Sequence, residues 1–391
     1  MRAFLLAFAL PSVLAGFASD AGQGGQVPFV AGDTHNYRPT TQERYDGQSV
    51  KRFNLQGMSR DRRDMLVHVL NSFDLDIWRV GNATVDVRVP FALWNAVLSA
   101  LPGNWDVSTM IPDVQELVEQ TRPRPSLLAE PDEPGDPKHP PWDMNDILTP
   151  FHDEYHSFDD MLLFGNALVQ AFPDLVTQTD LGTTEEGRPV RSWSIRAGQK
   201  KGEDDLPRYE FVVQSGQHAR EWVGPSSALY LLHAIALDAS HDPKGKWKEL
   251  LRSYTFTVVP MINPDGYVYS HEHSRMWKKN RQEVGGLVCK EPFEAKETRI
   301  MGNYLQNGTA DGERELPIKA FVDVHSYGQL CKHRGPDAIL TIVMFPYAYS
   351  CEDFPADAEN LMEAGLGAAK AMRMSEGQSY QTGQACDLTY R

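Results

Sequence analysis

The chain has few cysteines, no surplus of basic residues and no long apolar run after its first twenty residues. Its 391 residues include four cysteines, none in a CxxC spacing, which argues against a cysteine-ligated metal site. The formal net charge of −15 argues against nucleic acid or an anionic membrane surface as a partner, because both select basic patches. Since no later apolar run reaches the roughly 20 residues that a spanning helix needs, we expect no membrane span.

The four cysteines all lie in the last third of the chain, at Cys289, Cys331, Cys351 and Cys386. In an oxidising compartment they would tend to pair, and the sequence allows three full connectivities without selecting one. Buried free thiols are the alternative.

The first twenty residues have the pattern of a secretory signal peptide. Arg2 precedes the apolar run 3–10, and small residues follow at 14–19. The run is too short for a membrane anchor. The sequence therefore predicts secretion, with which the glycosylation sequons at Asn82 and Asn307 are compatible.

Prolines divide the rest of the chain. Eight of them lie between residues 121 and 150, interleaved with acidic residues, a composition typical of a linker open to proteolysis. Upstream, the order strand, helix, strand, strand, helix, strand predicts a ferredoxin-like α+β sandwich within 21–120. Downstream, alternating strands and helices predict an α/β domain at 151–391, with a mixed sheet covered by helices on both faces. The expected downstream elements are strands near 176, at 191–195, 208–214, 254–261 and 320–324, and helices at 159–171, 225–238, 301–306 and 356–374.

Two predicted strands end in residues that can bind a metal. His218 and Glu221 follow the strand-like run 209–214, and His325 ends the run 320–325. Ligands gather at the carboxyl ends of strands in α/β sheets, and two histidines with a glutamate leave a fourth zinc position open to water. One HxxE pair is weak by itself, because a satisfied loop histidine is the more common explanation.

Four ordered motifs make this context more specific. They resemble the zinc metallocarboxypeptidases of the carboxypeptidase A and B type, a family whose His2Glu site is well known. In that family the upstream sandwich is an inhibitory propeptide and the linker an activation region, so the resemblance implies a signal peptide at 1–20, a propeptide-like domain at 21–120, a linker at 121–150 and an incomplete metallocarboxypeptidase-like domain at 151–391. The motifs are Gly216-Gln-His-Ala-Arg-Glu-Trp222, Asn263-Pro-Asp-Gly-Tyr267, His273-Ser-Arg-Met-Trp-Lys-Lys-Asn-Arg281 and Val324-His-Ser-Tyr-Gly-Gln329.

The resemblance assigns roles to individual residues. His218, Glu221 and His325 would bind one zinc ion per chain, and the first two would also contact substrate. Ser326 and Tyr327 would line the peptide-binding subsites, although Tyr327 fits a core aromatic equally well.

Lys278 would also contact substrate, at a position where active members carry an arginine that polarises the scissile carbonyl. Lysine keeps the charge and loses the planar fork. The alternative is a solvated lysine in a basic run.

Three departures from the family pattern point to loss of catalysis. The Asn-Arg pair that grips the substrate carboxylate is missing between 281 and 293, and residues 331–344 form an insertion that is either a real loop or a translated intron. The capping tyrosine and the general-base glutamate are expected beyond residue 391. Without that base a zinc site keeps Lewis acidity and loses roughly 10²- to 10⁴-fold in rate.

The resemblance is closest to a fungal subgroup linked to cell-wall biogenesis and regarded as inactive. It implies a secreted, vacuolar or cell-wall protein whose partners are peptide C-termini or secreted and wall proteins. The alternative is an active zinc carboxypeptidase that removes C-terminal residues and is represented by a defective gene model.

Overall fold

The computed structural model describes residues 8–9, 42–80, 83–123, 142–198, 208–242, 245–282, 293–308, 316–326, 341–345, 350–376 and 380–386. The chain divides into two compact units. The larger unit comprises Met1–Gln42, Pro123–Ser326 and Glu359–Ala368, and the smaller unit comprises Glu43–Arg122, Tyr327–Ala358 and Ala369–Arg391.

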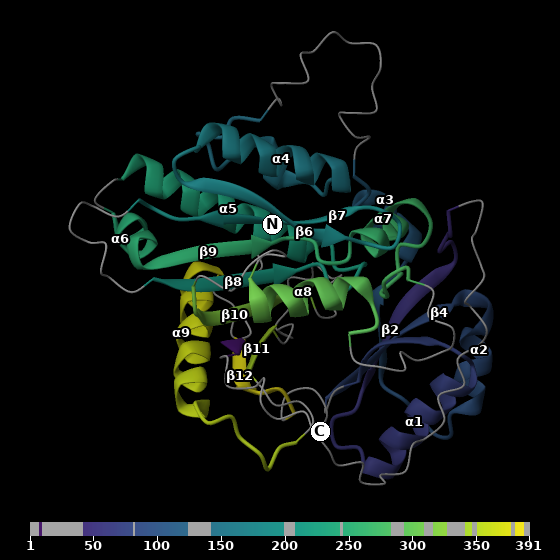
Figure 1. The fold of residues 1–391 in the computed structure, drawn as a ribbon. Coiled ribbons are helices and arrows are strands. Elements are labelled where there is room, and N and C mark those ends of the chain that lie inside the picture. The colour runs from purple at the N-terminus through teal and green to yellow at the C-terminus, as the bar shows by residue number, and fades with distance from the viewer. Residues whose placement is uncertain are drawn as a thin grey trace, which may run out of the picture. The chain divides into compact units, whose positions relative to one another are not determined.

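A six-stranded mixed sheet organises the larger unit, in the order β1-β10-β8-β9-β7-β6 (Figure 1). β8 pairs in parallel with both β10 and β9, whereas β7 pairs antiparallel with β9 and β6, and β1 antiparallel with β10. This confirms the predicted mixed sheet. The strands are β1 (Phe8–Ala9), β6 (Val176–Thr183), β7 (Pro189–Ile195), β8 (Tyr209–Ser215), β9 (Tyr254–Val259) and β10 (Ile318–Val324).

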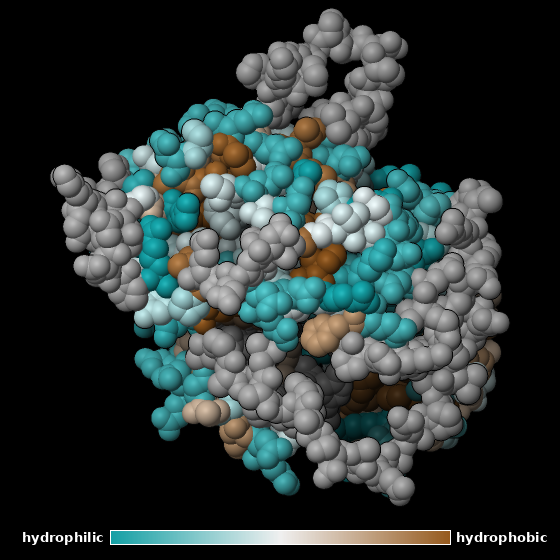
Figure 2. Space-filling view, in the orientation of Figure 1, coloured by the Kyte–Doolittle hydropathy of each residue, from teal (hydrophilic) through white to brown (hydrophobic). Residues whose placement is uncertain are grey.

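Helices cover both faces of this sheet, as the sequence predicts (Figure 1). Val213 and Val258 pack with α4 (Phe158–Ala171) and α5 (Val223–His241) in the main core, whereas their neighbours Val212 and Val259 pack with α8 (Lys296–Asn307) on the opposite face. This alternation follows from the two-residue period of a strand. The outer side of α8 carries mostly hydrophilic residues (Figure 2).

Three further helices of the larger unit, among the residues that the structure describes, are short. They are the 3-10 helix η3 (Pro150–Asp153), α6 (Lys246–Ser253) and α7 (Pro264–Glu272). The sequence pattern alone did not predict α6 or α7. Asn263 caps α7 by accepting a hydrogen bond from the Gly266 N–H at 3.0 Å, and Pro264 occupies its first turn.

Residues 43–122 of the smaller unit fold as the predicted ferredoxin-like sandwich. Their four strands are all antiparallel, in the order β3-β4-β2-β5, with helices at the two crossovers. Ser59 accepts a hydrogen bond from Arg62 N and caps α1, as expected for its position. The elements are β2 (Gln48–Asn54), α1 (Arg60–Ser72), β3 (Asp76–Val80), β4 (Thr84–Pro90), α2 (Phe91–Ala100), β5 (Val107–Ile111) and the unpredicted α3 (Val114–Gln120).

The C-terminal part of the chain contains β11 (Thr341–Phe345), α9 (Ala358–Glu376) and β12 (Tyr380–Gln384). β11 and β12 form a parallel pair. A disulfide joins Cys351 to Cys386, which selects one of the pairings that the sequence left open. Cys289 and Cys331 lie outside the described residues, as does the predicted insertion up to residue 340; its last four residues belong to β11.

Within the described part of the chain, no helix combines the length and apolarity needed to cross a bilayer. The division into signal peptide, propeptide, linker and enzyme-like domain stays a prediction. So does glycosylation: Asn82 is outside the described residues, and Asn307 is the exposed last residue of α8.

Candidate metal centre

His218 and Glu221 lie on a tight connection between β8 and α5. The strand ends at Ser215, and Gly216 has a φ of +72°, a left-handed conformation that glycine adopts without strain. A Cβ at Gly216 would approach Met261 Sδ to 2.7 Å, so a side chain would not fit there. The turn therefore sends His218 and Glu221 past the end of the sheet before α5 begins.

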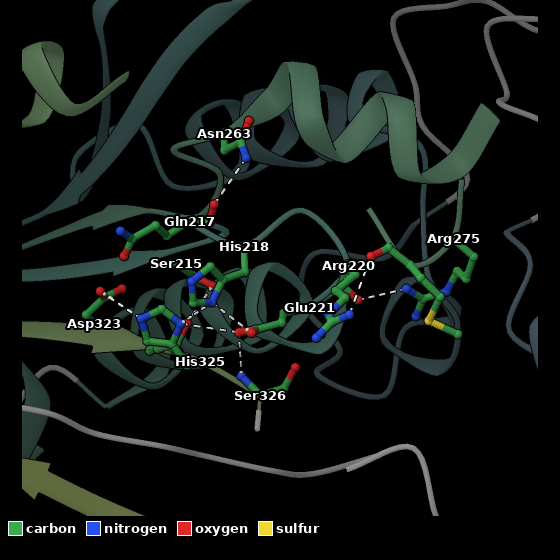
Figure 3. Close-up of polar contacts among 12 residues, drawn as sticks. Ser215, Gln217, His218, Arg220, Glu221, Asn263, Arg275, Asp323, His325 and Ser326 are labelled. Atoms are coloured by element: carbon green, nitrogen blue, oxygen red, sulfur yellow. Dashed lines mark hydrogen bonds and ion pairs between the residues drawn. The ribbon is translucent and has the colours of Figure 1, made fainter. Parts of the chain in front are cut away.

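His325 reaches the same place from β10. This strand runs parallel to β8, with Val324 paired to Ser215. Because the carboxyl ends of parallel strands meet at one edge of a sheet, residues more than 100 positions apart are brought together (Figure 3).

The two imidazole Nδ1 atoms and the two carboxylate oxygens of Glu221 converge at one point. Nδ1 of His218 lies 2.8 Å from Glu221 Oε1 and 3.1 Å from His325 Nδ1, and His325 Nδ1 lies 3.2 Å from Glu221 Oε2. Zinc bound to nitrogen and oxygen at roughly 2.0–2.1 Å in a tetrahedron separates its ligands by about 3.3–3.4 Å. The observed spacings of 2.8–3.2 Å are shorter than that by about 0.1–0.6 Å, so a small outward shift of the side chains lets this donor set hold zinc.

The electrostatics of the cluster are those of a carboxylate between two imidazoles. Burial raises the pKa of the Glu221 carboxyl, but hydrogen bonds from His218 and His325 outweigh burial and lower this pKa to about 2. Burial lowers the pKa of His325, and its contacts with Asp323 and Glu221 outweigh burial and raise it to about 10. The site thus keeps Glu221 ionised, in the form that a metal requires.

Two further groups contact the triad. Asp323 Oδ2 lies 2.9 Å from His325 Nε2, on the side of the ring away from the other ligands, and the Ser326 N–H donates to Glu221 Oε2 at 2.9 Å. Asp323 was not among the site residues predicted from the sequence. Its signal is the spacing, since residues 323 and 325 are two apart at the end of a strand and share a face.

The amide of Asn263 ties the metal-binding loop to the segment that follows α7. Its Nδ2 donates to the carbonyls of Gln217 and Lys279, both at 3.1 Å, and Asn263 is buried (Figure 3). One side chain thus fixes two backbone segments beside the site.

Arg275 supports the other side of the same loop. Its guanidinium donates to the Arg220 carbonyl at 2.7 Å and stacks 3.6 Å over the ring of Trp222. These contacts hold the residues on either side of Glu221, so the position of that ligand depends on the whole segment 263–279.

Of the other predicted substrate-binding residues, neither Lys278 nor Ser326 brings its side chain into the metal-binding cluster among the described residues. The Lys278 side chain is exposed, and the residue contacts the loop through its backbone carbonyl, which accepts a hydrogen bond from the Ala219 N–H at 3.0 Å. Ser326 reaches the triad through its backbone, and Tyr327 lies outside the described residues. The substrate roles of Lys278, Ser326 and Tyr327 stay predictions.

Comparison with known sequences identifies relatives that cover most of the chain. The profile of the family described as zinc carboxypeptidase matches residues 161–290 and 286–391. The inactive metallocarboxypeptidase ECM14 of Ajellomyces capsulatus (strain NAm1 / WU24) is 29% identical over 392 residues, which cover 91% of this chain and 61% of that protein. Its namesake from Talaromyces marneffei is 26% identical over 375 residues, covering 88% of this chain and 60% of the relative. The chain thus spans about three fifths of these relatives.

Solved structures share the fold at low sequence identity. Thrombin activatable fibrinolysis inhibitor matches with a TM-score of 0.67 and 17% identity, over 87% of this chain and 84% of its own. The carboxypeptidase A from Helicoverpa armigera matches with a TM-score of 0.65 and 19% identity, over 88% of this chain and 83% of its own.

Proposed function

Since this chain belongs to the zinc carboxypeptidase family, we propose that it is a zinc-binding, catalytically inactive member that acts in fungal cell-wall organisation or biogenesis. The observation that carries the proposal is the convergence of donor atoms from His218, Glu221 and His325 within 4.8 Å of one another. The fungal relatives named as inactive metallocarboxypeptidases support both the inactivity and the setting.

His218, Glu221 and His325 would hold one zinc ion per chain. Bound there, zinc would act as a Lewis acid toward a carbonyl or a water molecule. The chain contributes an ionised Glu221 carboxylate, a Ser326 N–H that keeps it oriented, and a loop fixed from behind by Asn263.

The zinc stoichiometry tests this part directly. Purified full-length protein should contain one equivalent of zinc after dialysis, and His218→Ala should lose it. His241→Ala is the matched control, because His241 is the exposed last residue of α5. A wild-type protein that retains no zinc would overturn the proposal.

The ligand that we propose for the site is the C-terminal end of a peptide or of a secreted or wall protein. Lys278, Ser326 and Tyr327 are the residues proposed to contact it. The ammonium of Lys278 is exposed and can meet a carboxylate as a point charge. Titration with a peptide that has a free or an amidated C-terminus tests this, and equal affinity for both would argue against recognition of the C-terminus.

The proposed inactivity is tested by hydrolysis. We expect no release of C-terminal residues from a free-ended peptide, with or without a zinc chelator. Chelator-sensitive release would favour the alternative, an active carboxypeptidase, and sequencing of the transcript would then show whether an Asn-Arg segment and a downstream glutamate are restored.

We further propose that residues 21–120, which contain most of the sandwich, are the family's propeptide, that 121–150 is its activation region, and that the protein is secreted to the vacuole or cell wall. Limited proteolysis should cut within 121–150 and leave two stable fragments. Digestion with an endoglycosidase should lower the mass of the secreted protein, and an Asn307→Gln variant should lose part of that shift.

A further inference from the structure

We propose that Asp323 is a positioning residue for the metal, a carboxylate that holds His325 in the one tautomer able to bind zinc. This inference rests on the proposed zinc binding and adds a residue outside the ligand set. It concerns the side of the His325 ring opposite the ligand atom (Figure 3).

The two ring nitrogens of His325 face different partners and so have different roles. Nδ1 faces His218 and Glu221, and Nε2 faces Asp323 Oδ2 at 2.9 Å. A carboxylate only accepts hydrogen bonds, so when zinc displaces one proton from this ring, Nε2 keeps its proton toward Asp323 and Nδ1 offers its lone pair to the metal. A flipped ring or the other tautomer would point a proton at the zinc position.

Asp323 is held firmly enough to fix this ring. It lies on β10, where it is paired in parallel register with Gln214 of β8, one residue before the pair of Val324 and Ser215. The backbone that carries the carboxylate is therefore part of the sheet. The strand after which His325 lies is hydrogen-bonded to the strand after which His218 lies.

A purely structural role explains Asp323 poorly. Among the described residues its ion-pair partner is His325, and its Oδ1 atom is buried without a hydrogen bond in that part of the chain. A buried unsatisfied oxygen is unfavourable for folding. The contact that compensates is with a metal ligand, where outer partners commonly contribute ~10–100-fold in metal affinity.

The two histidines of the triad differ in this respect. Among the described residues, a carboxylate contacts the second nitrogen of His325, whereas none contacts Nε2 of His218. Asp323 therefore supports only His325 among the three ligands. Its removal should lower the affinity for zinc without affecting the loop that carries His218 and Glu221.

The experiment uses the full chain and Zn²⁺ itself. Zinc affinity of wild type, Asp323→Asn and Asp323→Ala is measured by competition with a chromophoric chelator, beside the thermal melt of each zinc-free protein. Asp180→Asn is the control, since that carboxylate also lies in the sheet and pairs with a base, Arg191, at 2.6 Å.

We expect a loss of about tenfold for Asp323→Asn and of up to ~100-fold for Asp323→Ala, less than twofold for Asp180→Asn, and zinc-free melting temperatures close to wild type. Nitrogen-15 spectra of zinc-loaded protein should show His325 as the Nε2–H tautomer in wild type, and a weaker preference in Asp323→Ala.

The outcomes separate the two proposals. Wild type that binds zinc while Asp323→Ala binds it equally well would overturn the role of Asp323 and leave the zinc site intact. A lowered zinc-free melting temperature with unchanged zinc affinity would make Asp323 a structural residue and also overturn it. Wild type without zinc would remove the proposed function and this inference together.

Discussion

Two histidine pairs in the larger unit have nearly the same nitrogen-to-nitrogen distance and opposite character. His152 Nε2 lies 2.9 Å from His233 Nδ1, and His218 Nδ1 lies 3.1 Å from His325 Nδ1. The first pair has a neutral acceptor behind it, the Met144 carbonyl 2.8 Å from His233 Nε2. The second pair has carboxylates, Glu221 between the rings and Asp323 behind one of them.

The surroundings set the charge of each pair. Burial, followed by the proximity of His233 and His156, lowers the pKa of His152 to about 3, and burial likewise lowers the pKa of His233. The pKa of His325 is instead raised to about 10 by its two carboxylate contacts, against the effect of burial. The difference teaches that neighbouring carboxylates make a histidine pair suitable for binding a metal. Without such carboxylates, a buried histidine pair contributes to packing.

The largest contrast should appear in zinc affinity. His325→Ala removes a ligand atom, so we expect a loss greater than the ~10–100-fold typical of outer partners. His152→Ala removes an equally close histidine from the other pair and should leave affinity, per folded molecule, within a factor of about two. Competition with a chelator measures both, and loss of zinc by His152→Ala would erase the distinction between the pairs.

Stability should show the reverse order. His233 is fully buried, and His233→Ala leaves a cavity beside Phe164 and an unpaired Met144 carbonyl. We expect a cost of about 2–3 kcal/mol in the free energy of unfolding. Urea unfolding of the zinc-free protein measures it, with His325→Ala as the comparison, and a larger cost for His325→Ala would contradict our assignment of the packing role.

Acid should weaken the packing pair. Because the folded-state pKa of His152, about 3, lies below its unfolded value near 6.5, the unfolded chain binds more protons between these values. The contribution of neutral His152 to the free energy of unfolding is fully present above pH 6.5 and is lost as the pH falls toward 3. Melting temperatures of zinc-free wild type and His152→Gln across this range should converge, and parallel curves would rule out this contribution.

Alkali should weaken the metal-site pair, with a smaller effect because the site is partly exposed. The folded-state pKa of His325, about 10, lies above the unfolded value near 6.5. Its contribution in the chelated protein is therefore fully present below pH 6.5 and is lost as the pH rises through 10. The melting temperature of wild type relative to His325→Gln should fall over that interval, and a constant difference would argue against the ion-pair contacts.

Much of the fold follows from local pattern in the sequence. The alternation in β8 and β9 and the apolar spacing in α4 and α5 predict those elements to within a few residues. Helix α7 was missed because Asn263-Pro-Asp-Gly266 has the composition of a turn; its real signal was a capping residue followed by proline in the first helical turn. β11 and β12 are short, and each depends on a partner nearly 40 residues away.

The metal ligands could be predicted from the sequence. The residues that hold the metal-binding loop in place could not. The positions of His218, Glu221 and His325 after strand-like runs predicted that they would meet. The contacts of Asn263 and Arg275 with the metal-binding loop are made by side chains to backbone carbonyls more than 40 residues away, and no periodicity marks such pairs. Asp323 could have been found from its strand spacing.

Because β10 pairs in parallel with β8, zinc binding reports whether these two strands have paired in the correct register. Val324 lies opposite Ser215; His325 directly follows Val324, and His218 lies three residues after Ser215. A slip of one residue between the strands would turn His325 to the other face of the sheet, and a slip of two would displace it by about 6.6 Å along the strand. The site would then lack one zinc ligand while most of the core stayed packed. Chains with the wrong strand register would therefore be recognised because they bind no zinc.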